Sequence, residues 1–97
     1  MGKVIFTITY DVLPEKRDEY LALSQEMKLY LAGNGRNYSV YEEKGKKNSF
    51  AEIFSYNNME EFDQIEDDDE RMQQFVQQLE SMLANGKMKY RTLVELQ

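Results

Sequence analysis

One carboxylate in this sequence alternates with aromatic residues, and this spacing is the first indication of chemistry. Phe50, Glu52 and Phe54 occupy alternate positions of a strand-like run, so in a strand they point to the same face. A carboxyl group among aromatic rings has its pKa raised by desolvation unless a cation pairs with it. Glu52 is therefore a candidate catalytic general base, or an anchor for a phenolic or amine ligand.

A structural role for Glu52 is the alternative, because buried carboxylates are usually satisfied by partners within the protein. Arg91, Lys89 or a backbone group at a subunit boundary would then hold the carboxylate. The sequence leaves both interpretations open, since neither the depth of Glu52 nor its partner follows from the spacing alone.

Other strand residues are candidates for a ligand pocket around Glu52. The candidates are Thr7, Thr9, Phe50, Phe54, Tyr56 and Arg91, with either Tyr38 or Tyr41, and Tyr90, as further phenol donors. Thr7 and Thr9 can line the same cavity as Glu52, and Arg91 can bind an anionic substrate. Ordinary strand propensity explains the same Thr and Tyr residues, and a solvated Arg91 on an edge strand is the alternative to an anion site.

Five consecutive carboxylates, Glu66 to Glu70, are the second feature that suggests chemistry. An EF-hand calcium loop would need acids at alternating positions and a central Gly, and this run has no Gly. On a helix, five adjacent carboxylates point in too many directions to converge on one ion. Asp67 followed by Glu70 instead matches a capping box. We expect a helix start and no metal; an acidic surface for a basic partner is the alternative.

Composition excludes several kinds of site. The 97 residues include no Cys and no His, which excludes disulfides, thiolate catalysis, Ser-His-Asp chemistry and His-ligated haem. The net charge of −6 argues against nucleic acid as a partner, because nucleic-acid-binding proteins cluster Lys and Arg. No apolar run approaches the ~20 residues that span a bilayer. We expect a cytoplasmic protein with no membrane partner.

The hydrophobic pattern predicts the elements that position these residues. Alternation predicts strands at 4–12, 37–43, 49–56 and 88–96, and apolar spacings of three and four predict helices at 15–32 and 72–83. A shorter helical segment at 59–65 precedes the acidic run, and Asn58 is placed to cap it. The polar connection 44–48 makes the two middle strands a hairpin.

The order β-α-β-β-α-β predicts one α+β domain over residues 1–97 with a ferredoxin-like fold. This fold has a four-stranded antiparallel sheet with both helices on one face. Right-handed crossovers give the strand order 4-1-3-2. The first strand is apolar on both faces, which agrees with its central place in that order.

The second face of this sheet would have no helix over it. A monomer would leave an apolar face exposed, which proteins in water avoid, so we expect a homodimer through the open sheet face. Small residues of the third strand would face the helices, and Phe50, Phe54 and Tyr56 would lie on the open face. A register shift of one residue exchanges the faces, so the sequence does not decide which face looks inward.

The chain resembles the dimeric α+β barrel superfamily, especially its antibiotic-biosynthesis-monooxygenase-like branch, over nearly its whole length. The resemblance rests on the element order, on the length, and on the stretches "SFAEIFSYNNMEEFDQI" and "VLPEKRDEYLAL". Glu52 stands at the position of the family's strand Glu. The family often carries a His in the following helix, where this chain has Gln64 or Ile65.

The resemblance implies a cofactor-independent monooxygenase-like enzyme acting on a small aromatic or polyketide-like compound. Quinone-forming members need no cofactor because an electron-rich phenolic substrate itself reacts with oxygen. Haem-degrading members use His and Trp, and this chain has neither. The alternative is a non-catalytic small-molecule-binding or structural dimer whose own aromatic residues fill its interior. An enzyme would need an open cavity of ~300 Å³ or more between sheet and helices.

Overall fold

The computed structural model describes residues 2–64 and 69–96. Along the chain lie strand β1 (Val4–Asp11), the 3₁₀ helix η1 (Pro14–Lys16), helix α1 (Arg17–Gly33), strands β2 (Asn37–Glu42) and β3 (Ser49–Tyr56), helices α2 (Met59–Asp63) and α3 (Glu70–Glu80), and strand β4 (Lys89–Val94). These elements lie where the sequence pattern predicted them. Within the described ranges, no helix has the length and apolar character needed to cross a membrane.

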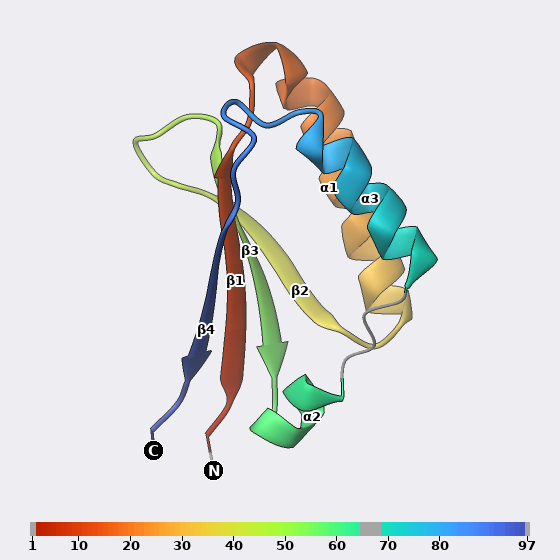
Figure 1. Ribbon diagram of the computed structural model, residues 1–97, viewed down its shortest axis with the longest axis vertical. Helices are drawn as coiled ribbons and strands as arrows, with labels where there is room; N and C mark the ends of the chain where they lie inside the picture. Colours follow the sequence, from red (N-terminus) through yellow and green to blue (C-terminus); the bar gives the residue numbers. More distant parts are fainter. Residues whose placement is uncertain (1, 65–68, 97) are drawn as a thin grey trace.

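The four strands form one antiparallel sheet in the order β2-β3-β1-β4. This is the predicted strand order read from the opposite edge, and it places β1 inside the sheet as its two apolar faces require. Helices α1 and α3 lie on one side of the sheet, and α2 lies near the end of β3 (Figure 1). The predicted α+β fold class is confirmed.

The register divides the strand residues between two faces of the sheet. Ile8 pairs with Glu52 and Phe6 with Phe54, and these even-numbered side chains point towards the helices. We call this side the helix face and the other side the open face. The helix face carries Val4, Phe6, Ile8, Tyr10, Tyr38, Val40, Phe50, Glu52, Phe54, Tyr56 and Tyr90, and the open face carries Ile5, Thr7, Thr9, Ala51, Ile53, Ser55, Arg91 and Leu93.

The structure decides between the two placements that the sequence left open for the aromatic residues of β3. Phe50, Phe54 and Tyr56 lie on the helix face rather than the open face, and all three are buried. The reason is volume, because the layer between a sheet and two helices must be filled at close to crystal density. Small side chains such as Ala51 and Ser55 cannot fill that layer, so they take the open face.

Helix α1 presents its predicted apolar stripe to the sheet. The buried residues of the stripe are Tyr20, Leu23, Met27 and Leu31. The helix ends at Gly33, and the backbone N–H of Arg36 then donates to the carbonyl oxygen of Leu31. Gly35 has a φ of +73°, a conformation that glycine adopts without a steric cost. The turn that contains Gly35 therefore ends the helix.

Both later helices begin at side-chain caps. Asn58 accepts a hydrogen bond from the N–H of Glu61 at 2.8 Å, as predicted. At the start of α3, Asp69 Oδ1 accepts from two backbone N–H groups at 3.0 and 3.2 Å. The end of the acidic run therefore starts a helix, with Asp69 as its cap. Asp67, the predicted capping residue, lies outside the described residues.

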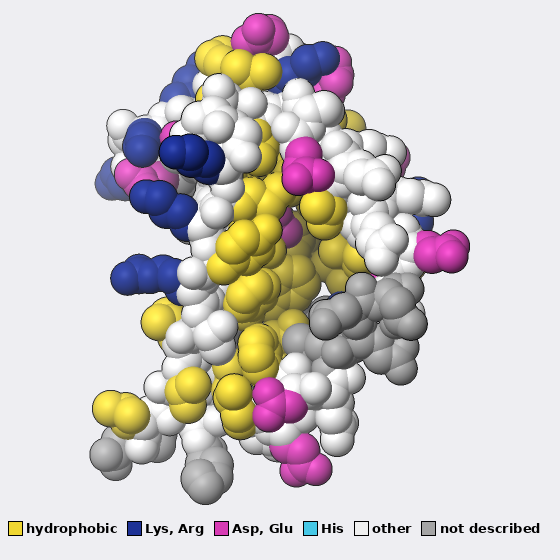
Figure 2. Space-filling model, viewed as in Figure 1, with side chains coloured by type: hydrophobic (Ala, Val, Ile, Leu, Met, Phe, Trp, Pro, Cys, Tyr) yellow, Lys and Arg dark blue, Asp and Glu magenta, His cyan; other side chains and the backbone are white. Residues whose placement is uncertain are grey.

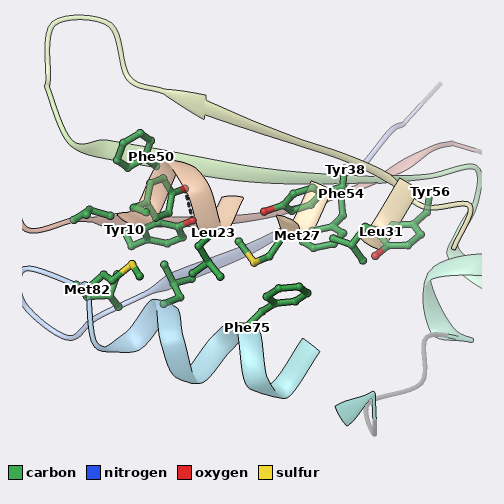
Figure 3. Packing of buried hydrophobic residues seen from close by; sticks show 14 of the residues in the cluster. Tyr10, Leu23, Met27, Leu31, Tyr38, Phe50, Phe54, Tyr56, Phe75 and Met82 are labelled. Carbon is green, nitrogen blue, oxygen red and sulfur yellow. Dashed lines mark hydrogen bonds between the residues drawn. The ribbon is translucent and has the colours of Figure 1, made fainter. Parts of the chain in front are cut away.

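The two helices leave a strip of the helix face uncovered. Phe75 and Leu79 of α3 are buried, and Figure 3 shows Phe75 among the side chains between α3 and the sheet. By contrast, every residue of β4 is exposed. A groove lies between α3 and the strands β1 and β3, and side chains of the helix face line it.

Phe75→Ala should lower the free energy of unfolding by about 3–5 kcal/mol, because it leaves a cavity where a nearly fully buried ring was packed. The neighbouring Val76 is 40% exposed, so Val76→Ala is the matched control and should change stability by less than about 1 kcal/mol. Urea denaturation measures both. Equal losses for the two variants would contradict the described burial of Phe75.

Candidate functional site

The groove between the helix face and α3 has a volume of about 760 Å³. Its apolar lining comes from four elements: Phe6 and Ile8 of β1, Phe54 and Tyr56 of β3, Phe62 of α2, and Met72 and Val76 of α3. Figure 2 shows hydrophobic side chains along this hollow. Small-molecule sites occupy roughly 300–1,000 Å³, so the groove can hold a compound of two or three fused rings.

Aromatic rings surround Phe6 at one wall of the groove. The Phe6 ring centroid lies 6.1 Å from that of Phe54, 6.0 Å from that of Phe62 and 6.1 Å from that of Tyr90. Phe62 in turn meets Tyr56 edge to face at 5.3 Å. Such rings present both π faces and positive edges, the two surfaces that another aromatic ring contacts favourably. The wall therefore suits a planar aromatic ligand.

Polar side chains complete the lining of the groove: Arg36, Asp63, Asp69, Gln73 and Gln77. Asp69 is held in place because the hydroxyl of Tyr30 donates to its two carboxylate oxygens at 2.9 and 2.8 Å. This hydrogen bond, with those from the first turn of α3, lowers the pKa of Asp69. Gln73 and Gln77 lie one turn apart on α3, and each amide can both donate and accept.

Glu52 is only 3% exposed and is held by tyrosine hydroxyls. Tyr10 donates to Glu52 Oε2 at 2.6 Å, and Tyr38 donates to Oε1 at 2.8 Å. Because the Tyr10 proton points to Glu52, the 2.7 Å contact between the hydroxyls of Tyr10 and Tyr20 has Tyr20 as donor. Figure 3 shows Tyr10 and Tyr38 among the buried side chains of the helix face. We call Tyr10, Tyr20, Tyr38 and Glu52 the carboxylate cluster.

Burial governs the pKa values of the carboxylate cluster. Desolvation raises the pKa of Glu52, and the hydrogen bonds from Tyr10 and Tyr38 oppose this rise. Desolvation also raises the pKa values of Tyr10, Tyr20 and Tyr38, so all three hydroxyls keep their protons and can donate. The cluster therefore satisfies a buried carboxyl with neutral donors rather than with a cation.

Some of the predicted site residues lie at the groove and others lie beside it. Phe54 and Tyr56 line the groove. Glu52 pairs across the sheet with Ile8, which lines the groove, but both oxygens of Glu52 are occupied by phenols. Phe50 lies on the same face and packs against Tyr20 at 4.3 Å, next to the carboxylate cluster. The structure thus places Glu52 behind the groove wall.

Thr7, Thr9 and Arg91 do not share a cavity with Glu52, contrary to the expectation from sequence. Thr7 pairs with Arg91 and Thr9 with Lys89, and all four side chains belong to the open face. The sheet itself therefore lies between these residues and the Glu52 carboxylate. The cause is the register, since residues one position apart on a strand point to opposite faces. Arg91 and Lys89 are consequently not the partners of Glu52.

Several groove residues were not among the predicted site residues. Phe62, Met72 and Val76 follow the helical apolar periodicity, which is the same for a core face and for a groove wall. Gln73 and Gln77 carried the one available signal, because two amides at a spacing of four flank the apolar stripe on the same side of the helix. Arg36 follows a glycine turn and had no distinguishing pattern.

No protein-family model and no curated protein matches the chain. Similar solved structures do exist. A protein from Caulobacter crescentus CB15, provisionally assigned as an antibiotic biosynthesis monooxygenase, has a TM-score of 0.80 and 16% identity over 99% of this chain and 92% of that one. A structure of an antibiotic biosynthesis monooxygenase has a TM-score of 0.75 and 17% identity over 100% of both chains.

A dimeric ferredoxin-like protein of unknown function from Thermobifida fusca YX is also similar, with a TM-score of 0.66 and 14% identity over 97% of this chain and 92% of that one. At these identities the comparisons establish the fold, which is ferredoxin-like. The superfamily that the sequence resembles has the same fold. Dimers occur among the similar ferredoxin-like structures.

Glu52→Gln should remove a pH dependence of stability. Because the folded-state pKa of Glu52 lies above its ordinary value of 4.5, the folded protein binds this proton more tightly than the unfolded chain does. The free energy of unfolding therefore falls as the pH rises from the ordinary value through the raised pKa. We expect wild-type stability to decline relative to that of the variant across this window, measured by urea denaturation at a series of pH values.

Glu80→Gln is the control for this experiment, because it removes one carboxyl group from an exposed position of α3. Curves of stability against pH that run parallel for the wild type and Glu52→Gln would contradict the raised pKa of Glu52.

Proposed function

We propose that this protein binds a small, planar aromatic compound in the groove and oxygenates it without a cofactor. The observation that carries the proposal is the open groove of about 760 Å³ walled by aromatic rings. A protein whose own side chains fill its interior would not leave such a space. The groove is larger than the ~300 Å³ that separates an enzyme site from a filled core.

Binding would rest on ring contacts inside and hydrogen bonds at the border. The rings of Phe6, Phe54 and Phe62 offer apolar and edge contacts to a flat ligand. Gln73 and Gln77 can donate to or accept from a phenolic hydroxyl or a carbonyl group. These contacts would orient the compound along the groove, with its oxygen substituents directed towards α3.

The reaction would draw its electrons from the substrate. An electron-rich phenol reduces O₂; one oxygen atom becomes a quinone oxygen at the ring carbon para to the hydroxyl, and the other leaves as water. For 1-naphthol, C₁₀H₈O and O₂ give 1,4-naphthoquinone, C₁₀H₆O₂, and H₂O. The protein's part would be to hold the reacting ring in an apolar groove, where positioning lowers the barrier. The resemblance to quinone-forming monooxygenases supports this reaction.

The proposal assigns Glu52 a positioning role rather than the role of general base. Both of its oxygens accept phenol hydrogen bonds, so neither is directed at a ligand in the groove. Tyr38, which donates to Glu52, has its ring centroid 4.8 Å from that of the groove residue Phe54. Glu52 would thus act on the groove through Tyr38 and Phe54.

The proposal also includes a homodimer formed through the open face. Ile5, Ile53 and Leu93 lie on this face with Thr7 and Thr9 among them, and Ile5 and Leu93 are exposed at 36% and 51%. A second copy laid over this face would bury those side chains. The dimeric ferredoxin-like proteins of similar structure support self-association.

Oxygen uptake with 1-naphthol tests the proposed reaction. Wild-type protein should bind 1-naphthol and consume oxygen as 1,4-naphthoquinone forms, with no added cofactor. Val76→Trp places a large ring in the groove and should weaken binding roughly five- to 150-fold, because steric overlap costs about 1–3 kcal/mol. Calorimetry measures binding, and an oxygen electrode measures turnover.

Gln78→Trp adds the same ring to an exposed position of α3 that does not line the groove, and it should leave both readouts unchanged. Binding without oxygen uptake would favour the non-catalytic ligand-binding alternative. Failure to bind 1-naphthol or other fused-ring phenols would contradict the proposal as a whole.

Ile53→Lys should shift the protein from dimer to monomer in sedimentation velocity experiments, because it would bury an unpaired ammonium group in the proposed interface. Gln25→Lys adds the same charge to an exposed position of α1 and should leave the dimer intact. A wild-type protein that sediments as a monomer at micromolar concentration would overturn the proposed interface.

A further inference from the structure

A second hollow, of about 390 Å³, adjoins the aromatic groove where β2 begins and β3 ends. Its lining includes Arg36, Asn37, Ser55, Tyr56, Glu61 and Gln64. We call it the polar hollow. Arg36 and Tyr56 line the groove as well as the polar hollow, so the two spaces meet at these two side chains.

The lining of the polar hollow differs in chemistry from that of the groove. Tyr56 supplies an aromatic ring, while Asn37 and Gln64 supply amides and Ser55 a hydroxyl. Groups of this kind donate and accept hydrogen bonds in several directions. Phe62, whose ring meets Tyr56 edge to face at 5.3 Å, belongs to the groove alone. The chemistry therefore changes from apolar to polar across Tyr56.

The described charges of the polar hollow oppose one another. Arg36 is cationic and Glu61 is anionic. Burial raises the pKa of the Tyr56 hydroxyl; Arg36 opposes this rise, and Glu61 adds to it. A carboxylate in the hollow would meet Glu61, and an ammonium group would meet Arg36. A neutral group that both donates and accepts hydrogen bonds fits this lining better than either ion.

We infer that the ligand is an aromatic compound carrying a neutral, hydroxyl-rich substituent of the glycosyl type, with its rings in the groove and the substituent in the polar hollow. This inference rests on the proposed function of the groove and adds the class of ligand. The hydroxyls of the substituent bond to the amides of Asn37 and Gln64, and the ring of Tyr56 gives it an apolar surface. Asn37 and Ser55 pair where β2 begins and β3 ends; both belong to the open face, and they line the polar hollow at this end of the sheet.

A pair of related probes tests the inference: 4-methylumbelliferone and its β-D-glucoside, titrated by calorimetry into the full chain under nitrogen. The glucoside should bind roughly five to ten times more tightly than the aglycone, because it adds about two net hydrogen bonds. The double variant Asn37→Ala/Gln64→Ala should bind the glucoside as weakly as the aglycone, with the affinity for the aglycone unchanged.

Gln25→Ala/Gln78→Ala is the matched control, since it removes two exposed amides that line neither space, and it should retain the preference for the glucoside. A glucoside that binds no more tightly than the aglycone would overturn the inference and leave the proposed function of the groove intact. Equal weakening of both probes by Asn37→Ala/Gln64→Ala would also overturn it. Absence of binding by both probes would instead remove the groove as a ligand site, and the inference with it.

Discussion

The burial of one carboxylate without a cation constrains how this sheet meets its first helix. Glu52 lies on β3, and its phenol partners come from β1, β2 and, through Tyr10, from α1. A buried carboxyl that loses its donors costs several kcal/mol, so the four elements must approach until hydroxyl oxygens lie 2.6 to 2.8 Å from their acceptors. The large rings of Tyr10, Tyr20 and Tyr38 then fill the layer between sheet and helix, and α1 is held over β1, β2 and β3.

The second helix is not held in this way, and the groove is the result. Helix α3 packs its buried residues Phe75 and Leu79 against the interior, while β4 remains exposed along its whole length. The rings of Phe6 on β1 and Tyr90 on β4 stack with their centroids 6.1 Å apart. Among the described residues, no helix covers this part of the helix face, so the two rings lie beside open space. One end of the helix face is thus a closed polar cluster, and the other is an open aromatic wall. The same strand alternation produces both, because Glu52 and Phe54 are neighbours on one face.

Much of this architecture could be predicted from the sequence, because periodicity identifies elements directly. The alternation around Val4 and the stripe from Tyr20 to Leu31 predicted a central strand and a buried helix, and Asn58 predicted a cap. The choice of face could not be predicted, since Phe50 and Ala51 differ by one position and a shift of one exchanges them. Tyr38 was a candidate phenol donor, but the roles of Tyr10 and Tyr20 could not be predicted. These two residues lie 42 and 32 positions from Glu52 along the chain and look like ordinary β and core residues.

Asp69 links the stability of the first turn of α3 to the shape of the groove. Its carboxylate caps the backbone of α3 and also accepts the hydroxyl of Tyr30 from α1, and it lies at the border of the groove. Fraying of the first turn of α3 would therefore release the tie between the two helices. The width of the groove is thus coupled to local unfolding at the N-terminal end of α3. A compound that contacts the groove at Asp69 would therefore change the hydrogen-exchange protection of the backbone amides in the first turn of α3.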